Sequence, residues 1–250
     1  MYSQKLLPKV RNIDLPKKVV YRQRRSKKVL TKLEYQYRQG RTYEDFKSFM
    51  EANPYLPVVE MDTVKGGRNK GKVFLTMIFR RTSFMLIFLM NDGTQDSVIQ
   101  IFDSLTEILG VSLFKRLFPV ILTDNGVEFK NPQALEHTRT GLSRTRVFFC
   151  APQASWQKPQ VENNHRLIRR ILPKGVSFSP LTVADVTLIC CHINSVLREN
   201  LDNKTPFDLM DSKDGKKLLS LLQLSPIPPD EVTLSPKLLF HLNGGYLKTT

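Results

Sequence analysis

Apolar residues recur between positions 58 and 90 in three short runs, separated by glycine-rich or basic turns. The runs cover residues 58–64, 72–79 and 83–90, and each is rich in β-branched and aromatic side chains. Runs of this length and composition are typical of β-strands, and strands so close in sequence usually lie side by side. The pattern therefore predicts an antiparallel three-stranded meander.

Beyond residue 94 the apolar spacing changes to that of helices. Residues 94–109 carry apolar side chains three and four positions apart and end at Gly110, which predicts an amphipathic helix. Similar spacing and capping signals predict further helices at residues 42–51, 132–137, 160–172 and 181–197. Short apolar runs predict two more strands, at residues 119–123 and 146–150.

The resulting order, β-β-β-α-β-α-β-α-α, is the organisation of a ribonuclease-H-like α/β domain. We expect a mixed sheet flanked by helices, with the first three strands antiparallel and the later strands joined across helices. The predicted boundaries are a basic arm at residues 1–40, a core at 41–210 and a C-terminal extension at 211–250.

Composition favours a protein that folds in a reducing compartment. The chain has 250 residues, of which 41% are hydrophobic, enough for a buried core. Its cysteines, Cys150, Cys190 and Cys191, have neither disulfide nor zinc-ligand spacing. No apolar stretch reaches the 18 or so residues of a membrane span, and no signal peptide is recognisable. We therefore expect a cytoplasmic protein without membrane association.

Positive charge is concentrated near the N-terminus. The formal net charge is +15, and residues 1–41 contribute +11 of it, from 13 Lys and Arg against two acids. Such a block attracts nucleic acid, because neutralising phosphates releases condensed counterions. A solvated arm without a special role is the alternative. The densest part of the block supplies candidate phosphate contacts: Arg22, Arg24, Arg25, Lys27 and Lys28.

Three acids lie inside or beside the predicted elements. Asp62 interrupts an apolar strand, Asp124 directly follows a short one, and Glu162 opens a helix. A charge within an apolar strand is costly unless it is paired or bound to a cation. Taken singly, Asp124 fits an ordinary turn and Glu162 a favourable first helical turn, but Asp62 has no such ordinary explanation.

If the fold brings these carboxylates together, their repulsion should raise at least one pKa. Divalent metal would relieve that repulsion. Oxygen ligands without neighbouring Cys or His suit Mg²⁺ or Mn²⁺ better than Zn²⁺. Two such ions can drive in-line phosphoryl transfer.

Three segments together resemble the integrase-core transposases of the insertion sequence thirty family. They are residues 58–66 (VVEMDTVKG), 122–129 (LTDNGVEF) and 161–175 (VENNHRLIRRILPKG), with APQASWQK at 151–158 before the last. The resemblance covers roughly residues 41–210. It implies a DDE polynucleotidyl transferase that nicks DNA at element ends and joins it to target DNA without a covalent protein intermediate. Double-stranded DNA and further copies of the chain would be its partners.

The resemblance assigns roles residue by residue. Asp62, Asp124 and Glu162 stand where the family has its metal ligands, and Asn125 and Gly126 would shape the turn around the second. Trp156 is expected to pack or stack rather than to catalyse. Candidate phosphate contacts lie on or beside the glutamate helix: Lys158, Asn163, Arg166, Arg169, Arg170 and Lys174.

Two departures from the family pattern stand out. The 38 steps from Asp124 to Glu162 are more than the family usually has, and we place the excess in the basic loop at 138–146. Family members also carry helix-turn-helix segments upstream, where this chain has only the basic arm. We therefore expect a fragment, a truncated copy or the second part of a split gene.

Other functions were weighed against this one. Residues 66–72 (GGRNKGK) resemble a phosphate-binding loop, but Val73 replaces the Ser or Thr that holds magnesium, and a strand follows instead of a helix. We interpret the segment as a hairpin turn and expect no nucleotide cofactor. A nuclease that cleaves without joining and a non-catalytic DNA-binding remnant stay open as alternatives.

Overall fold

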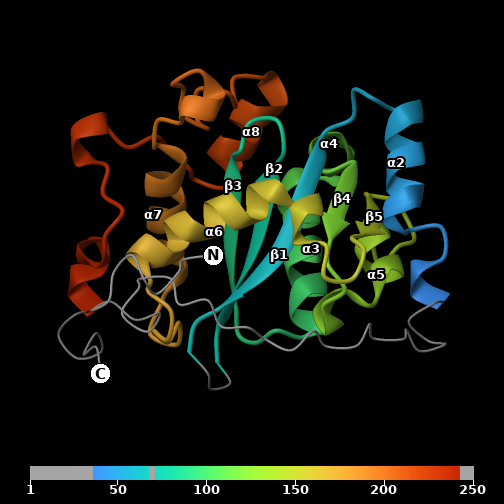
Figure 1. Ribbon diagram of the computed structural model, residues 1–250, viewed down its shortest axis with the longest axis horizontal. Helices are drawn as coiled ribbons and strands as arrows, with labels where there is room; N and C mark the ends of the chain where they lie inside the picture. The colour runs from blue at the N-terminus through green and yellow to red at the C-terminus, as the bar shows by residue number, and fades with distance from the viewer. Residues whose placement is uncertain (1–35, 68–70, 243–250) are drawn as a thin grey trace, which may run out of the picture. The chain divides into compact units, whose positions relative to one another are not determined.

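The computed structural model describes residues 36–67 and 71–242 (Figure 1). Within these residues the chain builds a five-stranded sheet in the order β3-β2-β1-β4-β5. Its strands are β1 (Val58–Lys65), β2 (Val73–Phe79), β3 (Met85–Met90), β4 (Val120–Thr123) and β5 (Arg146–Phe149). Strands β1 to β3 pair antiparallel, whereas β4 runs parallel to β1 and β5 parallel to β4. The predicted meander and the ribonuclease-H-like mixed sheet are confirmed.

The α-helices are α2 (Tyr43–Ala52), α3 (Gln95–Leu109), α4 (Val111–Leu117), α5 (Pro132–Glu136), α6 (Pro159–Ile171), α7 (Val183–Asn194) and α8 (Lys213–Leu221). Short 3₁₀ turns occur at η2 (Val127–Phe129), η3 (Ser155–Gln157), η4 (Glu199–Leu201), η5 (Pro229–Glu231) and η6 (Pro236–Leu242). The five predicted helices are present. Their N-termini show the expected chemistry: the side chains of Thr42, Thr94 and Thr182 each accept a backbone N–H from the first turn.

The sequence pattern missed α4 and α8 and made α7 too long. Gly110 ends α3 as predicted, but its φ of 74° turns the chain directly into α4. A glycine adopts this backbone conformation without steric cost, so the stop signal of one helix is also the start of the next. Helix α7 ends at Asn194 because the N–H of Ser195 bonds the carbonyls of both Cys191 and His192 and closes the last turn.

Helices cover both faces of the sheet. Val59 and Met61 of β1 point into a core shared with α3, α4 and α8, in which Leu218 of α8 is fully buried. Side chains alternate along a strand, so Val64 points the other way, into a core with α6 and α7. Figure 1 shows α6 crossing one face of the sheet and α3 lying behind the other. Asp62 therefore lies on the α6 side.

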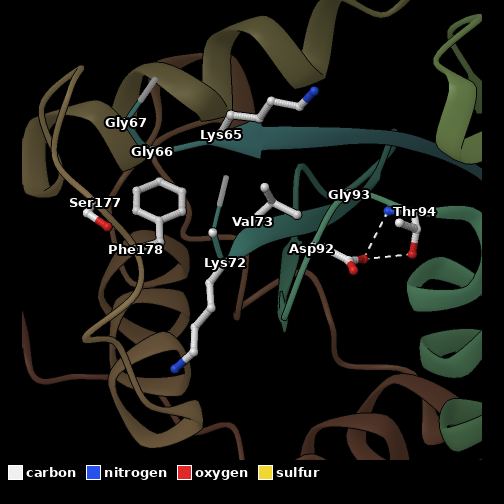
Figure 2. A pocket seen from close by; sticks show the side chains of 11 residues that line it. Lys65, Gly66, Gly67, Lys72, Val73, Asp92, Gly93, Thr94, Ser177 and Phe178 are labelled. Carbon is white, nitrogen blue, oxygen red and sulfur yellow. Dashed lines mark hydrogen bonds between the residues drawn. The ribbon is translucent and has the colours of Figure 1, made fainter. Parts of the chain in front are cut away.

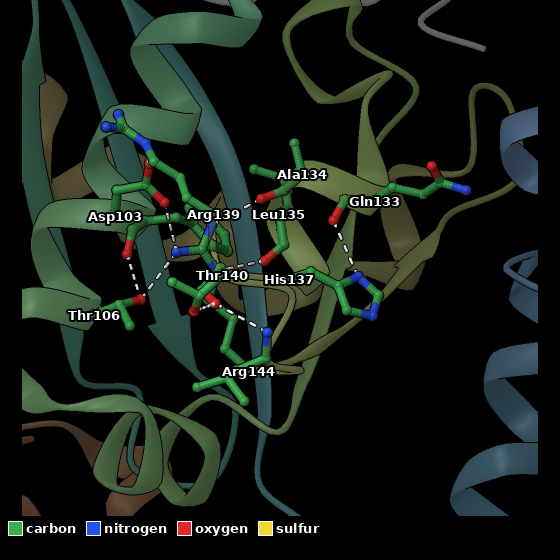
Figure 3. Close-up of polar contacts among 12 residues, drawn as sticks. Asp103, Thr106, Gln133, Ala134, Leu135, His137, Arg139, Thr140 and Arg144 are labelled. Atoms are coloured by element: carbon green, nitrogen blue, oxygen red, sulfur yellow. Dashed lines mark hydrogen bonds and ion pairs between the residues drawn. The ribbon is translucent and has the colours of Figure 1, made fainter.

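The basic loop at residues 138–146 is anchored by a buried arginine. Arg144 is fully buried, and its guanidinium donates to the carbonyls of Ala134 and Leu135, to Asp103 and to Thr106 (Figure 3). These partners come from α5 and α3, so the loop joins two helices to the start of β5. The segment in which we expect the excess length between Asp124 and Glu162 thus contributes a buried polar anchor to the fold.

Among the described residues, no single helix is long and apolar enough to cross a bilayer, and α3 with α4 reaches the required length and hydropathy only as a pair bent by 112°.

Candidate active site

The sheet brings the two aspartates to one place. The last paired residues of the parallel strands β1 and β4 are Glu60 and Leu122. Asp62 and Asp124 each lie two positions further on, at the same level of neighbouring strands. Both carboxylates also lie within reach of one lysine, Lys158, which directly precedes α6. The predicted proximity of Asp62 and Asp124 follows from this parallel pairing.

Lys158 lies between the two aspartates as a tethered cation. Its Nζ lies 3.2 Å from Oδ2 of Asp62 and 3.9 Å from Oδ2 of Asp124, and it donates to the carbonyl of Met61 at 3.1 Å. The residue is only 5% exposed. The phosphate contact expected for Lys158 does not fit this placement, because its ammonium is turned into the protein.

Each aspartate is also oriented by backbone. The N–H of Thr63 donates to Oδ1 of Asp62 at 2.7 Å, and the N–H of Gly126 donates to Oδ1 of Asp124 at 2.9 Å. A Cβ on Gly126 would lie 3.1 Å from that same Oδ1 and 2.7 Å from Oε2 of Glu128. No side chain fits there without displacing a carboxylate, which explains the glycine in the Asp-Asn-Gly turn.

Glu128 is a further acid at the site that the sequence analysis left without a role. It is buried, and Oγ1 of Thr63 donates to its Oε1 at 2.7 Å. Thr63 follows Asp62, so Glu128 reaches from the turn after β4 to the strand that carries the first aspartate. Its place four residues after Asp124 was visible in the sequence, but only the η2 turn brings it back to β1.

Burial dominates the electrostatics of the first aspartate. The pKa of Asp62 is raised, first by desolvation and further by the charge of Asp124, while Lys158 opposes the shift. The raised pKa agrees with the sequence-based expectation. Burial, however, is a larger cause than the repulsion on which that expectation rested.

The helix that carries Glu162 is fixed to β1 by a buried glutamate. Oε2 of Glu60 accepts the N–H groups of Gln160 and Val161 at 3.0 and 3.1 Å, and Oε1 binds Nε of Arg80 at 2.8 Å. Lys158, the N-cap of α6, makes no side-chain cap of its own. Glu60 therefore satisfies the first N–H groups and complements the positive end of the helix.

Glu60 was missed as a site residue in the sequence, although a signal exists. It lies two positions before Asp62, and residues two apart on a strand share one face. Because its charge is fully buried, its pKa is raised by desolvation, against the opposing effects of Arg80 and the two N–H donors.

Glu162 lies on the exposed side of the first turn of α6. Further along the helix, Nε2 of His165 lies 2.9 Å from Oγ1 of Thr76, the β2 residue paired with Asp62. Gln160 is held by Glu60, and His165 contacts Thr76, so Glu162 lies on the stretch of helix between these two contacts with the sheet.

The structure does not bring the glutamate side chain into contact with the aspartates. Across residues 36–67 and 71–242, no three acidic, His or Cys side chains are arranged as a metal-binding group. The structure thus joins Asp62 to Asp124 through Lys158 and places Glu162 on the neighbouring helix.

His165 is a neutral group within this arrangement. Burial lowers its pKa to about 4, and the charges of Lys158 and Arg169 act in the same direction. Oγ1 of Thr76 lies 3.2 Å from the carbonyl of Asp62, so the imidazole is linked through Thr76 to the backbone of the first aspartate. The sequence analysis gave His165 no role, because a lone histidine on a helix carries no signal of its own.

The remaining candidate DNA contacts divide by exposure. Asn163, Arg166, Arg170 and Lys174 are exposed on α6 or just beyond it. Arg169 instead donates to the carbonyl of Lys65 and lies over the ring of Phe178. Trp156 is 73% exposed and is not part of the core. The arm candidates Arg22, Arg24, Arg25, Lys27 and Lys28 lie outside the described residues.

The glycine-rich segment at 66–72 connects two strands, as predicted, since β1 ends at Lys65 and β2 begins at Val73. Nζ of Lys72 donates to the carbonyl of Leu181. Figure 2 shows this lysine beside a pocket of about 420 Å³ that Phe178 also lines. No helix follows the glycines, so the dipole that a phosphate-binding loop requires is missing.

These features define the class of the domain: a ribonuclease-H-like mixed sheet with two aspartates at one level of neighbouring parallel strands. Homologous proteins are transposases. The chain is 30% identical over 148 residues to the transposase of insertion sequence element IS4351 from Bacteroides fragilis, covering 59% of this chain and 42% of that protein. It is 30% identical over 153 residues to transposase InsI of element IS30C from Escherichia coli (strain K12), covering 61% and 37%.

A probable transposase of element IS1161 from Streptococcus salivarius is 27% identical over 225 residues, 89% of this chain and 57% of that protein. The resemblance to transposases of the insertion sequence thirty type is thereby confirmed. The chain spans about two fifths of the length of the first two relatives. No protein-family model matches it.

Solved integrase structures resemble it at low sequence identity. One is the simian T-cell lymphotropic virus intasome in complex with a PP2A regulatory subunit, with 21% identity, 69% of this chain and 58% of that chain covered, and a TM-score of 0.49. Another is the HTLV-2 integrase catalytic core domain in complex with magnesium, with 17% identity, 62% and 97% covered, and a TM-score of 0.43.

Proposed function

We propose that this chain is the catalytic core of a DNA transposase that cleaves DNA strands and transfers them to a target. Asp62, Asp124 and Glu162 would bind two Mg²⁺ or Mn²⁺ ions. The single observation that carries the proposal is the meeting of Asp62 and Asp124 at the same level of β1 and β4, around one cation. The similarity to transposases supports the same conclusion independently.

The donors at this site fit a hard divalent cation. Two carboxylates and the carbonyl of Met61 already surround the ammonium of Lys158, and all three supply oxygen. Oxygen ligands are what Mg²⁺ and Mn²⁺ prefer. Cys150 lies nearby, but burial raises its pKa to about 12, so it offers no thiolate at neutral pH.

Each residue has a stated part in this proposal. Asp62 and Asp124 hold the ions from the sheet, and Glu162 supplies a third carboxylate once its side chain turns towards them. Glu60 fixes the start of α6 to β1, and the N–H of Gly126 fixes one oxygen of Asp124. When bound, the ions activate a water or a 3′-hydroxyl and stabilise the leaving oxygen of in-line phosphoryl transfer.

DNA would be bound through phosphates rather than base edges. Exposed Asn163, Arg166, Arg170 and Lys174 would contact the backbone beside the site, and the arm at residues 1–40 would add affinity without sequence preference. Binding by the arm should weaken with salt, with a logarithmic slope of about −0.9 per phosphate neutralised. A salt-independent affinity, or discrimination between specific and random duplexes by the arm alone, would contradict this part. Further copies of the chain on DNA and a cytoplasmic location complete the proposal.

The decisive experiment uses Asp62→Asn, which keeps the shape of the side chain and removes its charge. Two reactions with Mg²⁺ are measured: nicking of plasmid DNA and joining of a precut oligonucleotide. Both should be lost in the variant while DNA binding persists, because ion binding fails and the basic residues are unchanged. Asp211→Asn, at an exposed position before α8, is the matched control and should retain both activities.

The outcomes separate the alternatives. Nicking without joining in the unaltered chain would indicate a nuclease of the same fold. DNA binding without either reaction would indicate a non-catalytic remnant. Undiminished cleavage by the Asp62→Asn variant would rule out the two-ion site.

A further inference from the structure

The position of Lys158 has a consequence for how metal enters the proposed site. The ammonium is 3.2 Å and 3.9 Å from the two aspartate oxygens, which is hydrogen-bond to ion-pair range. Magnesium binds its oxygen ligands at about 2.0–2.1 Å. The same carboxylates must therefore close more tightly around an ion than they do around the lysine. An ion held by both would also place a divalent charge against a buried ammonium.

Leaving the lysine in place is electrostatically unfavourable. Like charges a few ångströms apart repel strongly where water is excluded, and Lys158 is only 5% exposed. Removing the lysine without a replacement is also unfavourable, because the partly buried Asp62 would lie beside Asp124 without a counter-charge. The ammonium of Lys158 and a divalent metal ion thus compete for the carboxylate oxygens of Asp62 and Asp124, and one of the two cations has to be present.

Release of the lysine does not require the helix to move. Glu60 holds the backbone of Gln160 and Val161, and Arg80 holds the carbonyl of Gln157. The backbone on both sides of Lys158 is therefore fixed independently of its ammonium. A lysine side chain has four rotatable methylene groups, so rotation about these bonds is sufficient to withdraw Nζ.

We propose that Lys158 is a built-in competitor for the divalent cation, which neutralises Asp62 and Asp124 in the metal-free state and must swing out when metal binds. This inference rests on the proposed function, since it takes the two aspartates to be metal ligands. It adds a role for a residue whose sequence position suggested only a phosphate contact. Once released, the ammonium becomes available at the mouth of the site.

The first test measures Mn²⁺ binding to the purified chain by calorimetry, without DNA. Lys158→Met should tighten binding by about tenfold or more, equivalent to about 1.4 kcal/mol, roughly one hydrogen bond to a charged group. Lys216→Met removes the same charge from an exposed position on α8 and is the matched control. It should change affinity by much less. Equal tightening in both variants, or none in Lys158→Met, would overturn the proposal.

The second test follows the lysine directly and does not depend on a variant that folds. Acylation of lysine amines is quantified by mass spectrometry with and without Mg²⁺. Lys158 should be protected without metal and should react several-fold faster with it, while exposed Lys174 should be unaffected. An unchanged or slower reaction of Lys158 at saturating metal would overturn the inference.

Asp62→Asn separates the two hypotheses. Metal binding that is lost in Asp62→Asn but unaffected by Lys158→Met would leave the proposed function standing and refute the competitor role. Metal binding that is absent, or insensitive to Asp62→Asn, would refute the metal site itself.

Discussion

Replacing Glu60 tests whether α6 is fixed by a single buried side chain. Both oxygens of this carboxylate are occupied, one by Arg80 and the other by the N–H groups of Gln160 and Val161. Glu60→Ala removes all three contacts and leaves the first turn of α6 without acceptors. Breaking a buried ion pair costs about 3–5 kcal/mol. Arg80 is 30% exposed and recovers some hydration, so we expect about 3 kcal/mol.

For a chain of this size, a decrease of 1 kcal/mol in the free energy of unfolding lowers Tm by roughly 2–4 °C. The Tm of Glu60→Ala should therefore be about 10 °C lower. Glu60→Gln should cost only about 1–2 kcal/mol, since an amide oxygen still accepts a hydrogen bond and burial already penalises the charge, as the raised pKa shows. Thermal and urea unfolding measure both values. Glu107→Ala, at an exposed position on α3, is the control and should change Tm by 1 °C or less.

The same variant should impair catalysis beyond its effect on stability, because Glu162 follows the two anchored residues. At a temperature where Glu60→Ala is fully folded, the rate of Mg²⁺-dependent nicking should fall at least about tenfold. A tenfold fall corresponds to an increase of only about 1.4 kcal/mol in the activation free energy. A variant as stable as the unaltered chain would show that Glu60 does not anchor the helix. A destabilised variant with full activity would show that the anchor does not position Glu162.

Two further predictions follow from the surroundings of the aspartates. The pKa of His165 is lowered to about 4, so the unfolded chain takes up this proton first and stability should fall as pH drops from 6.5 towards 4, by up to roughly 3 kcal/mol. Asp62 and Glu60 have raised pKa values, so their protonation stabilises the folded chain as pH drops and opposes the effect of His165. The contribution of His165 is therefore the difference in free energy of unfolding between the unaltered chain and His165→Gln, measured by urea unfolding at each pH. Identical pH profiles of the two proteins would refute the prediction. Gly126→Ala places a Cβ 2.7 Å from Oε2 of Glu128. It should weaken Mn²⁺ binding about tenfold and lower the free energy of unfolding by about 1–3 kcal/mol. Unchanged Mn²⁺ affinity in calorimetry would contradict this prediction.

Several features were predictable because their causes are local. The period of apolar residues gave the five strands and five of the helices, since burial of one face dictates that period. Thr42 and Gly110 marked helix ends through hydrogen bonds made within a few residues. Asp62 lies in an apolar strand, where burying an unpaired charge is energetically unfavourable. This made it a candidate metal ligand. Motif order then supplied the resemblance, and homologous transposases confirm it.

Other features depend on contacts between distant parts of the chain. Glu60 is 100 residues from Gln160, and Thr63 is 65 residues from Glu128. No period or spacing connects such pairs. Helix α8 was missed because it is short and its apolar side chains, Leu218, Leu219 and Leu221, are confined to its C-terminal end. It packs on α3 and α4 through Leu218 and through an ion pair of Arg116 with Asp214.

Lys158 shows most clearly where the sequence reaches its limit. The sequence places a lysine four residues before Glu162, and the basic residues around it suggested a phosphate contact. Whether that cation faces DNA or the aspartates depends on the direction of a long side chain at the start of α6. That direction is decided by the parallel pairing of β1 with β4, which gathers two carboxylates, and by Glu60, which sets the helix beside them. Two partly buried carboxylates attract the nearest positive charge, and only the tertiary structure determines which charge is nearest.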